Sequence, residues 1–150
     1  ILSFFDSEKG TYNFQSDKAL DSIISGGYFG KGVGEGTLKN RVPEAHTDYI
    51  ISVISEEFGV ASIVLILILF LIFIFSILKK VNQENDDKIK LILVGSISLI
   101  LLQAMIHIGV NIRLFPTTGM TLPYLSYGGS SIISVSIMSG IILNLTKRRV

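Results

Sequence analysis

The 150-residue sequence contains no cysteine, which excludes a disulfide scaffold, a thiolate metal site and a cysteine nucleophile. It also lacks an excess of charge of either sign, since 13 Lys and Arg face 12 Asp and Glu for a net charge of +1. A nucleic-acid-binding protein would show a basic excess, so we expect no nucleic acid partner. Low hydrophobicity is absent too, because 49% of the chain is apolar and the mean hydropathy is +0.59. That composition excludes a disordered tail.

The apolar residues gather in three long segments. Residues 60–78 carry no charge, and a helix of this length rises about 28 Å, close to the roughly 30 Å hydrocarbon core of a bilayer. Residues 91–110 form a second candidate span, and residues 124–145 form a third that Ser and Gly interrupt. We therefore expect an all-α polytopic membrane protein with three transmembrane helices.

Lys and Arg near the ends of these segments predict the orientation, because cytoplasmic loops are enriched in positive charge. Residues 79–90 hold four lysines and the tail 146–150 holds three basic residues, whereas residues 111–123 hold only Arg113. The predicted organisation is an extracytoplasmic loop 1–58, a span 59–78, a cytoplasmic loop 79–90, a span 91–110, an extracytoplasmic loop 111–123, a span 124–145 and a cytoplasmic tail 146–150.

The long first loop contains two predicted helices. Ser16–Ser25 has apolar residues at helical spacing and is followed by two glycines, so we expect a short amphipathic helix on the membrane surface. Pro43 can open a second helix that runs to Phe58. Its polar face would carry Glu44, Asp48, Ser52, Ser55 and Glu56, and its apolar face Tyr49, Ile50, Val53, Ile54 and Phe58.

The start of this second helix could carry chemistry. Glu44 and Asp48 are four residues apart, so their carboxylates would be neighbours on a helix and one pKa would rise. Such a carboxylate at the mouth of a membrane cavity could act as the general base for a sugar hydroxyl. The alternative is a solvated helix start, where acidic residues are favoured by the helix dipole.

Residues 26–36 contain six glycines and Lys31. They are not a Walker A motif, because Lys31 is followed by glycine rather than by Ser or Thr. The backbone amides and Lys31 could cradle a phosphate or pyrophosphate group. A flexible surface loop is the alternative, since glycine permits many conformations.

A polar stripe runs along the second span, formed by Ser96, Gln103, His107 and Asn111 on one helix face. Such residues face either the interior of a bundle or a water-filled cavity, and the alternative is simple hydrogen bonding between helices. No carboxylate or second histidine lies at ligand spacing from His107, so we expect no metal site there. Small residues from Gly128 to Ser131 favour close helix packing.

Three motifs together resemble the SEDS family, the polytopic peptidoglycan polymerases of cell division (FtsW), elongation (RodA) and sporulation (SpoVE). They are Pro-Glu-Ala-His-Thr-Asp at 43–48 with Ser-Glu-Glu-Phe-Gly at 55–59, the glycine-rich segment 25–36, and the segment 115–131 that opens the third span. The resemblance covers essentially all 150 residues. Thr-Gly-Met-Thr-Leu-Pro at 118–123 is closer to the cell-division branch. Thr118 departs from a lysine common in that branch, and Arg113 could supply the charge instead.

The resemblance implies a ten-span protein, of which this chain would hold the large outer loop and the last three spans. It implies polymerisation of lipid II into glycan strands during septal wall synthesis, at the bacterial cytoplasmic (inner) membrane. Asp48 corresponds to the essential aspartate and would deprotonate the acceptor hydroxyl. The pyrophosphate leaving group needs positive charge, for which Lys31, Lys39 and Arg41 are candidates. The full predicted set of substrate contacts is Glu44, His46, Thr47, Lys31, Lys39, Arg41, Gln103, His107, Ser126, Tyr127 and Ser130.

No cofactor follows from the sequence, although a divalent cation, Mg²⁺ or Mn²⁺, could assist. The implied partners are lipid II, a class B penicillin-binding transpeptidase and other divisome proteins. Three alternatives stay open: a lipid II flippase or transporter whose path the polar stripe lines, a RodA-type elongation polymerase, and a non-catalytic scaffold that docks other proteins.

Overall fold

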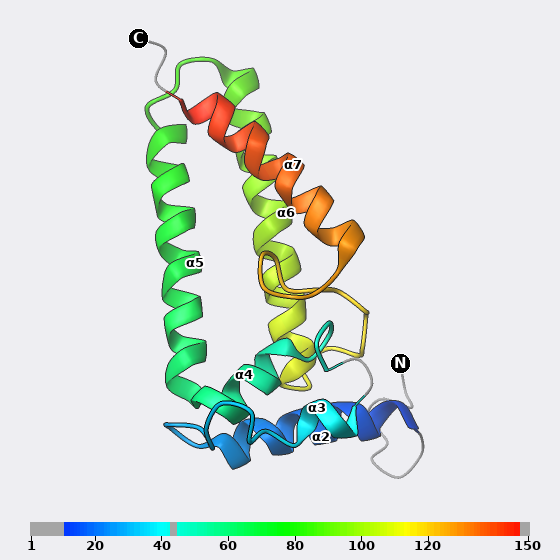
Figure 1. The fold of residues 1–150 in the computed structure, drawn as a ribbon. Coiled ribbons are helices and arrows are strands. Elements are labelled where there is room, and N and C mark those ends of the chain that lie inside the picture. Colours follow the sequence, from blue (N-terminus) through cyan, green and yellow to red (C-terminus); the bar gives the residue numbers. More distant parts are fainter. Residues whose placement is uncertain (1–10, 43–44, 148–150) are drawn as a thin grey trace.

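The computed structural model describes residues 11–42 and 45–147, and these two stretches form helices joined by loops, with no strand. In chain order the helices are α2 (Thr11–Gly26), α3 (Leu38–Arg41), α4 (Ile50–Phe58), α5 (Val60–Val81), α6 (Asp87–Asn111) and α7 (Gly129–Thr146). The fold is therefore all-α, as the hydropathy pattern predicts (Figure 1).

Helices α5, α6 and α7 are each long and apolar enough to cross a membrane. In the most apolar window of α5 only 6% of the residues are buried within the chain, so its surface of Leu, Ile and Phe faces outward. An apolar surface of this extent needs a non-aqueous neighbour. The chain is a membrane protein with three helices of spanning length.

Both of the first two spanning helices are longer than the sequence predicts. Helix α5 continues to Val81, beyond the predicted end at 78. Helix α6 begins at Asp87, four residues before the predicted start, because the Asp86 carboxylate caps it by accepting a hydrogen bond of 2.9 Å from the backbone N–H of Lys88.

The third spanning helix starts later than predicted. Residues 124–128 form a turn and an extended link, and α7 begins only at Gly129. Tyr124 adopts a left-handed backbone with φ of 67°, which a helix cannot include. Its hydroxyl pairs with the Ser139 hydroxyl of α7 at 2.7 Å, and its ring packs against Phe70 and Phe73 of α5. These contacts hold the turn between two membrane helices.

The short helices form a layer across one end of the spanning helices (Figure 1). There α5 begins and α6 ends, and α2 packs on α4 and α6. Which end faces the cytoplasm stays a prediction from the distribution of lysine and arginine.

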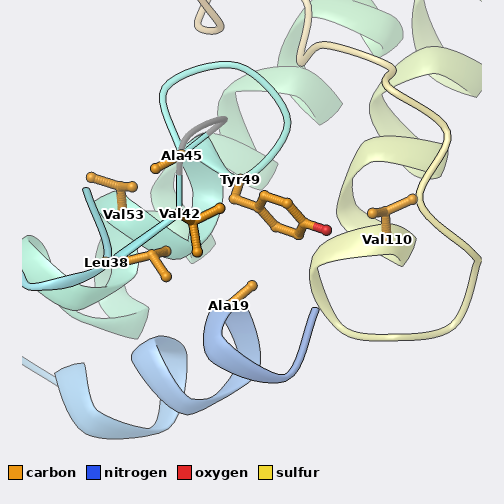
Figure 2. Close-up of a cluster of buried hydrophobic side chains, with 7 residues drawn as sticks. All are labelled: Ala19, Leu38, Val42, Ala45, Tyr49, Val53 and Val110. Carbon is orange, nitrogen blue, oxygen red and sulfur yellow. The ribbon is translucent and has the colours of Figure 1, made fainter. Parts of the chain in front are cut away.

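A buried apolar cluster joins this layer to the membrane helices (Figure 2). Its members are Ala19, Leu38, Val42, Ala45, Tyr49, Val53 and Val110. They come from α2, from α3 and the segment that follows it, from α4 and its preceding turn, and from the end of α6. Figure 2 shows the Tyr49 ring in the middle of the cluster, and Tyr49 is 1% exposed. The turn before α4 is thereby fixed from both sides.

The predicted helix from Pro43 to Phe58 is wrong in its start, and the α4 part of its polar face is buried together with Tyr49 and Val53 of its apolar face. Residues 45–49 are turns, and α4 begins only at Ile50. Ser52 and Glu56 of the predicted polar face are fully buried, whereas Phe58 of the predicted apolar face is half-exposed. The buried polar groups are tolerated because distant residues pair with them. Glu44, together with Pro43, lies outside the described residues.

Helix α2 replaces the predicted surface helix over Ser16–Ser25 and is longer, covering Thr11–Gly26. Of the predicted apolar face, Ala19 is fully buried against the layer, but Ile24 is 69% exposed. The helix packs on α4 and α6, and its position on the membrane surface stays a prediction.

Candidate active site

Asp48 lies in the turn that precedes α4, with its side chain half-buried. Burial raises the pKa of the Asp48 carboxyl, and a hydrogen bond from the Thr47 side chain partly lowers it again. The net effect is a carboxylate with a greater affinity for protons than an exposed aspartate. A group of this kind suits proton abstraction.

The backbone of this turn is held at three consecutive carbonyl groups. The His46 carbonyl accepts from the backbone N–H of Tyr127 at 3.3 Å, and the Thr47 carbonyl accepts from the Ser126 hydroxyl at 2.8 Å. The Asp48 carbonyl accepts from the Asn111 side-chain amide at 3.0 Å. Because the donors belong to α6 and to the loop before α7, the turn and that loop form one unit.

Asn111 is the central donor and acceptor of this unit and has no exposed surface. Its amide also donates to the His107 carbonyl at 2.8 Å. Its oxygen accepts from the Ser52 hydroxyl at 2.7 Å and from the Ser52 backbone N–H at 3.3 Å. Asn111 thus joins the end of α6 to both the Asp48 turn and α4.

Two other residues of the polar stripe, Gln103 and His107, hold the loop that leads to α7. The Gln103 amide donates to the Thr121 carbonyl at 2.9 Å and to the Ser131 hydroxyl at 3.1 Å. The Met120 carbonyl accepts at 2.8 Å from Nδ1 of His107, which must therefore carry the proton. Gln103 and His107 thus fasten the loop before α7 to α6, and their predicted substrate contacts remain predictions.

The loop also reaches Asp48 directly. Gly119 has a φ of 65°, and a side-chain carbon built on it would lie 3.8 Å from Oδ2 of Asp48. The tip of the loop therefore lies beside the carboxylate. Of the residues here that are predicted to contact substrate, Ser126 is buried and hydrogen-bonded, whereas Tyr127 in the loop and Ser130 at the start of α7 are exposed. His46 is exposed as well.

The glycine-rich segment wraps around the end of α4. The backbone N–H groups of Lys31 and Gly32 donate to the carbonyls of Glu56 and Glu57 at 2.9 and 3.1 Å. A Cβ on Gly30 would come within 2.2 Å of the Glu57 oxygen, and one on Gly26 within 2.1 Å of the Ser55 oxygen. Gly26 and Gly30 are required here by close backbone approach. The amides of Lys31 and Gly32 are engaged by protein carbonyls, whereas a phosphate contact of the Lys31 side chain stays a prediction.

Glu56 anchors this segment, and sequence reasoning missed it. Its side chain is 1% exposed and accepts from the Lys31 ammonium at 2.9 Å, from the Thr37 hydroxyl at 3.1 Å and from the Leu38 N–H at 3.0 Å. Burial raises the pKa of Glu56, but these donors outweigh it and lower the pKa to about 2. The signal available in the sequence was a carboxylate within a largely apolar helical segment, residues 50–58.

Two of the predicted pyrophosphate contacts meet at a small pocket. Lys31 and Arg41 line a cavity of about 210 Å³ together with Lys18, a residue that the sequence did not single out. The side chain of Lys39 lies outside the described part of the chain. Within that part, no group of three or more His, Asp or Glu side chains is placed to hold a metal ion.

Comparison with known proteins identifies relatives over nearly the whole chain. The FtsW/RodA/SpoVE family model, described as a cell cycle protein, matches residues 1–150. A probable peptidoglycan glycosyltransferase FtsW of Caulobacter vibrioides is 40% identical over 135 residues, which is 90% of this chain and 35% of that protein. The corresponding protein of Enterococcus hirae is 38% identical over 91% of this chain and 35% of its own length.

A relative named for sporulation has a similar identity. The stage V sporulation protein E of Bacillus subtilis is 39% identical over 89% of this chain and 37% of its own length. The chain thus spans little more than a third of the length of these three relatives.

Proposed function

This chain belongs to the FtsW/RodA/SpoVE family, and from that premise we propose that it forms part of a peptidoglycan glycosyltransferase that polymerises lipid II at the bacterial cytoplasmic membrane. The observation that carries the proposal is Asp48, a half-buried carboxylate of raised pKa on a turn held at three carbonyl groups. A base held this firmly can be positioned against one hydroxyl of a bound sugar.

In the proposed reaction the Asp48 carboxylate takes the proton from the 4-hydroxyl of the acceptor sugar. The hydroxyl oxygen forms a new bond to the anomeric carbon of the donor. The bond between that carbon and the pyrophosphate oxygen breaks, and undecaprenyl pyrophosphate leaves with the electron pair. The proton on Asp48 then passes to water, which restores the base. General-base catalysis of this kind contributes about 10²- to 10⁴-fold to a rate.

We place the protein in the cell-division branch, because two of the relatives above carry the name FtsW at 38–40% identity. A class B penicillin-binding transpeptidase and other divisome proteins are its proposed partners. The alternative is an elongation polymerase of the RodA type. Expression of the complete gene in strains depleted of either FtsW or RodA separates the two, and rescue of filamentous growth supports the cell-division role.

A transporter function gains no support from the polar stripe. Gln103, His107 and Asn111 each hydrogen-bond to the loop before α7 or to the Asp48 turn. Polar groups engaged in this way are not arranged along an open path through the membrane.

The test is Asp48→Asn in the complete gene product that carries this chain, purified and supplied with labelled lipid II. We expect the polymerisation rate to fall by at least about 10²-fold, since the amide cannot accept the proton. Glu35→Gln is the matched control, because Glu35 is an exposed carboxylate in the same loop. Polymerisation by the Asp48→Asn protein at the rate of the control would refute the role of Asp48. Repeating the assay with EDTA and then with Mg²⁺ or Mn²⁺ tests the proposed assistance by a divalent cation.

A further inference from the structure

The pocket beside Glu56 is a second polar feature of the layer formed by the short helices, separate from Asp48. Its charged and hydroxyl-bearing lining consists of Lys18, Lys31, Arg41, Asp21 and Glu56 with Ser22, Ser25 and Thr37. At about 210 Å³ it has room for roughly seven water molecules of about 30 Å³ each. This is the size of a small polar group rather than of a disaccharide.

The electrostatics of the pocket favour an anion. Three cationic side chains face two carboxylates, which leaves one net positive charge. Glu56 is ion-paired with Lys31 at 2.9 Å and is 1% exposed, so these two charges offset each other, and Lys18 and Arg41 remain against one carboxylate. The second carboxylate, Asp21, is 68% exposed to solvent and lies 3.8 Å from Lys18.

The distance from Asp48 decides which anion the pocket suits. Helical hydrogen bonding begins at Tyr49, whose carbonyl accepts from the Val53 N–H at 3.1 Å. Glu56 is eight residues beyond Asp48, so the pocket lies about 12 Å from the proposed base. The pyrophosphate of the donor must lie next to the attacked carbon and therefore next to Asp48. The pyrophosphate of the acceptor is separated from the reacting hydroxyl by two sugar rings, a length comparable to this separation.

The pocket is also close to the start of a membrane helix. The backbone N–H of Val60, the first residue of α5, donates to the Gly27 carbonyl at 2.9 Å. Tyr28 and Phe29, which follow, are 80% and 92% exposed, as aromatic side chains at a membrane interface are. A phosphate group bound here would leave its lipid chain at the level of the bilayer surface.

We propose that the pocket lined by Lys18, Lys31 and Arg41 binds the pyrophosphate of the acceptor substrate, a polyprenyl-pyrophosphate-linked disaccharide. The proposal rests on the glycosyltransferase function proposed above. The pocket then holds the substrate that supplies the attacking hydroxyl, and other residues contact the departing pyrophosphate.

The test uses the complete gene product with Arg41→Gln, Lys18→Gln and both changes together. We expect each single change to raise the KM for lipid II by about tenfold, the loss of one charge-assisted hydrogen bond, with kcat little altered. Arg41→Lys keeps the charge and should recover part of the affinity. Lys88→Gln, at an exposed lysine far from the pocket in sequence, is the matched control and should leave KM unchanged. An unchanged KM in the double variant would overturn the proposal.

Equilibrium binding separates this proposal from the proposed function. Lipid II binding to the Asp48→Asn protein should weaken when Arg41→Gln is added, whether or not the wild-type protein polymerises. Undecaprenyl pyrophosphate should compete for the pocket, and vesicles of phosphatidylglycerol should not. Equal competition by phosphatidylglycerol would assign the pocket to a phospholipid. If Arg41→Gln weakened the binding of inorganic pyrophosphate but not of lipid II, the pocket would be a site for a free anion. Either result would refute the acceptor role. An inactive wild-type protein would refute the proposed function only.

Discussion

Asp48 and Glu56 lie eight residues apart in the chain, yet their carboxyl groups have opposite properties. Glu56 is the more deeply buried, but it has the lower pKa, about 2, because a lysine, a hydroxyl and a backbone N–H donate to it. Asp48 is only half-buried, yet its pKa is raised. Burial removes water and raises the pKa, and the hydrogen bond from the Thr47 side chain only partly counteracts this. The number of donors, rather than the depth of burial, sets the proton affinity here.

The difference separates two tasks. Glu56 is ionised at every physiological pH and holds the glycine-rich segment and α3 to the end of α4. Asp48 keeps its carboxylate available, and its position is fixed through the backbone. Variants at each region can test whether the two tasks are truly separate.

The largest effect on stability is expected in the glycine-rich segment. Gly30→Ala should destabilise the protein by about 4 kcal/mol, because its Cβ would lie 2.2 Å from the Glu57 oxygen and its φ is 78°. Gly27→Ala is the matched control, since Gly27 also has a positive φ of 58° but nothing within 4 Å. It should cost only about 1 kcal/mol. Thermal unfolding in detergent measures both, and equal losses would contradict the close packing described here.

A somewhat smaller effect is expected for Glu56→Gln. The lowered pKa of Glu56, about 2 against 4.5 for the free side chain, corresponds to about 3 kcal/mol of stability. Because the folded-state pKa is depressed, this contribution is present above about pH 4.5 and is lost as the pH falls towards 2. Hydrogen exchange at the Lys31 and Gly32 amides should show this dependence in the wild type.

The Glu56→Gln protein should lack that dependence between pH 4.5 and 2. Asp48→Asn serves as the comparison, because it should leave the exchange at these amides unaffected. If both variants loosened the segment equally, the two carboxylates would not have separate tasks.

The smallest effect is expected next to Asp48. Thr47→Val removes the side-chain hydrogen bond that lowers the pKa of Asp48, so that pKa should rise further. Since the base acts in its ionised form, the acidic limb of the rate profile should move to higher pH. Thr47→Ser keeps the hydroxyl and should keep the limb in place. A limb that does not move in Thr47→Val would mean that another group controls the profile.

The sequence predicted the membrane helices well, because their signal depends only on local composition. The stretch that became α5 has no charge before Lys79, and no tertiary contact is needed to recognise it. The family resemblance also placed Asp48 in the candidate site before any contact was known.

The sequence failed where polar side chains are buried by distant partners. Ser52 belongs to the predicted polar face, but its hydroxyl is buried and pairs with Asn111, 59 residues later. Glu56 was assigned to the same face, and its partner Lys31 lies 25 residues earlier. Helical periodicity takes polarity as a sign of exposure, and it cannot anticipate a partner from elsewhere in the chain. Periodicity likewise gives no sign that Lys18 and Arg41, which lie on different helices, line the same pocket.

The turn that carries Asp48 is held through carbonyl oxygens, which every amino acid possesses. Its shape is therefore specified by Asn111, Ser126 and the backbone of Tyr127. The side chains of residues 46–48 are left to determine reactivity. Under natural selection, or in a directed screen, such a division lets the chemistry of the turn diversify while its architecture is inherited unchanged.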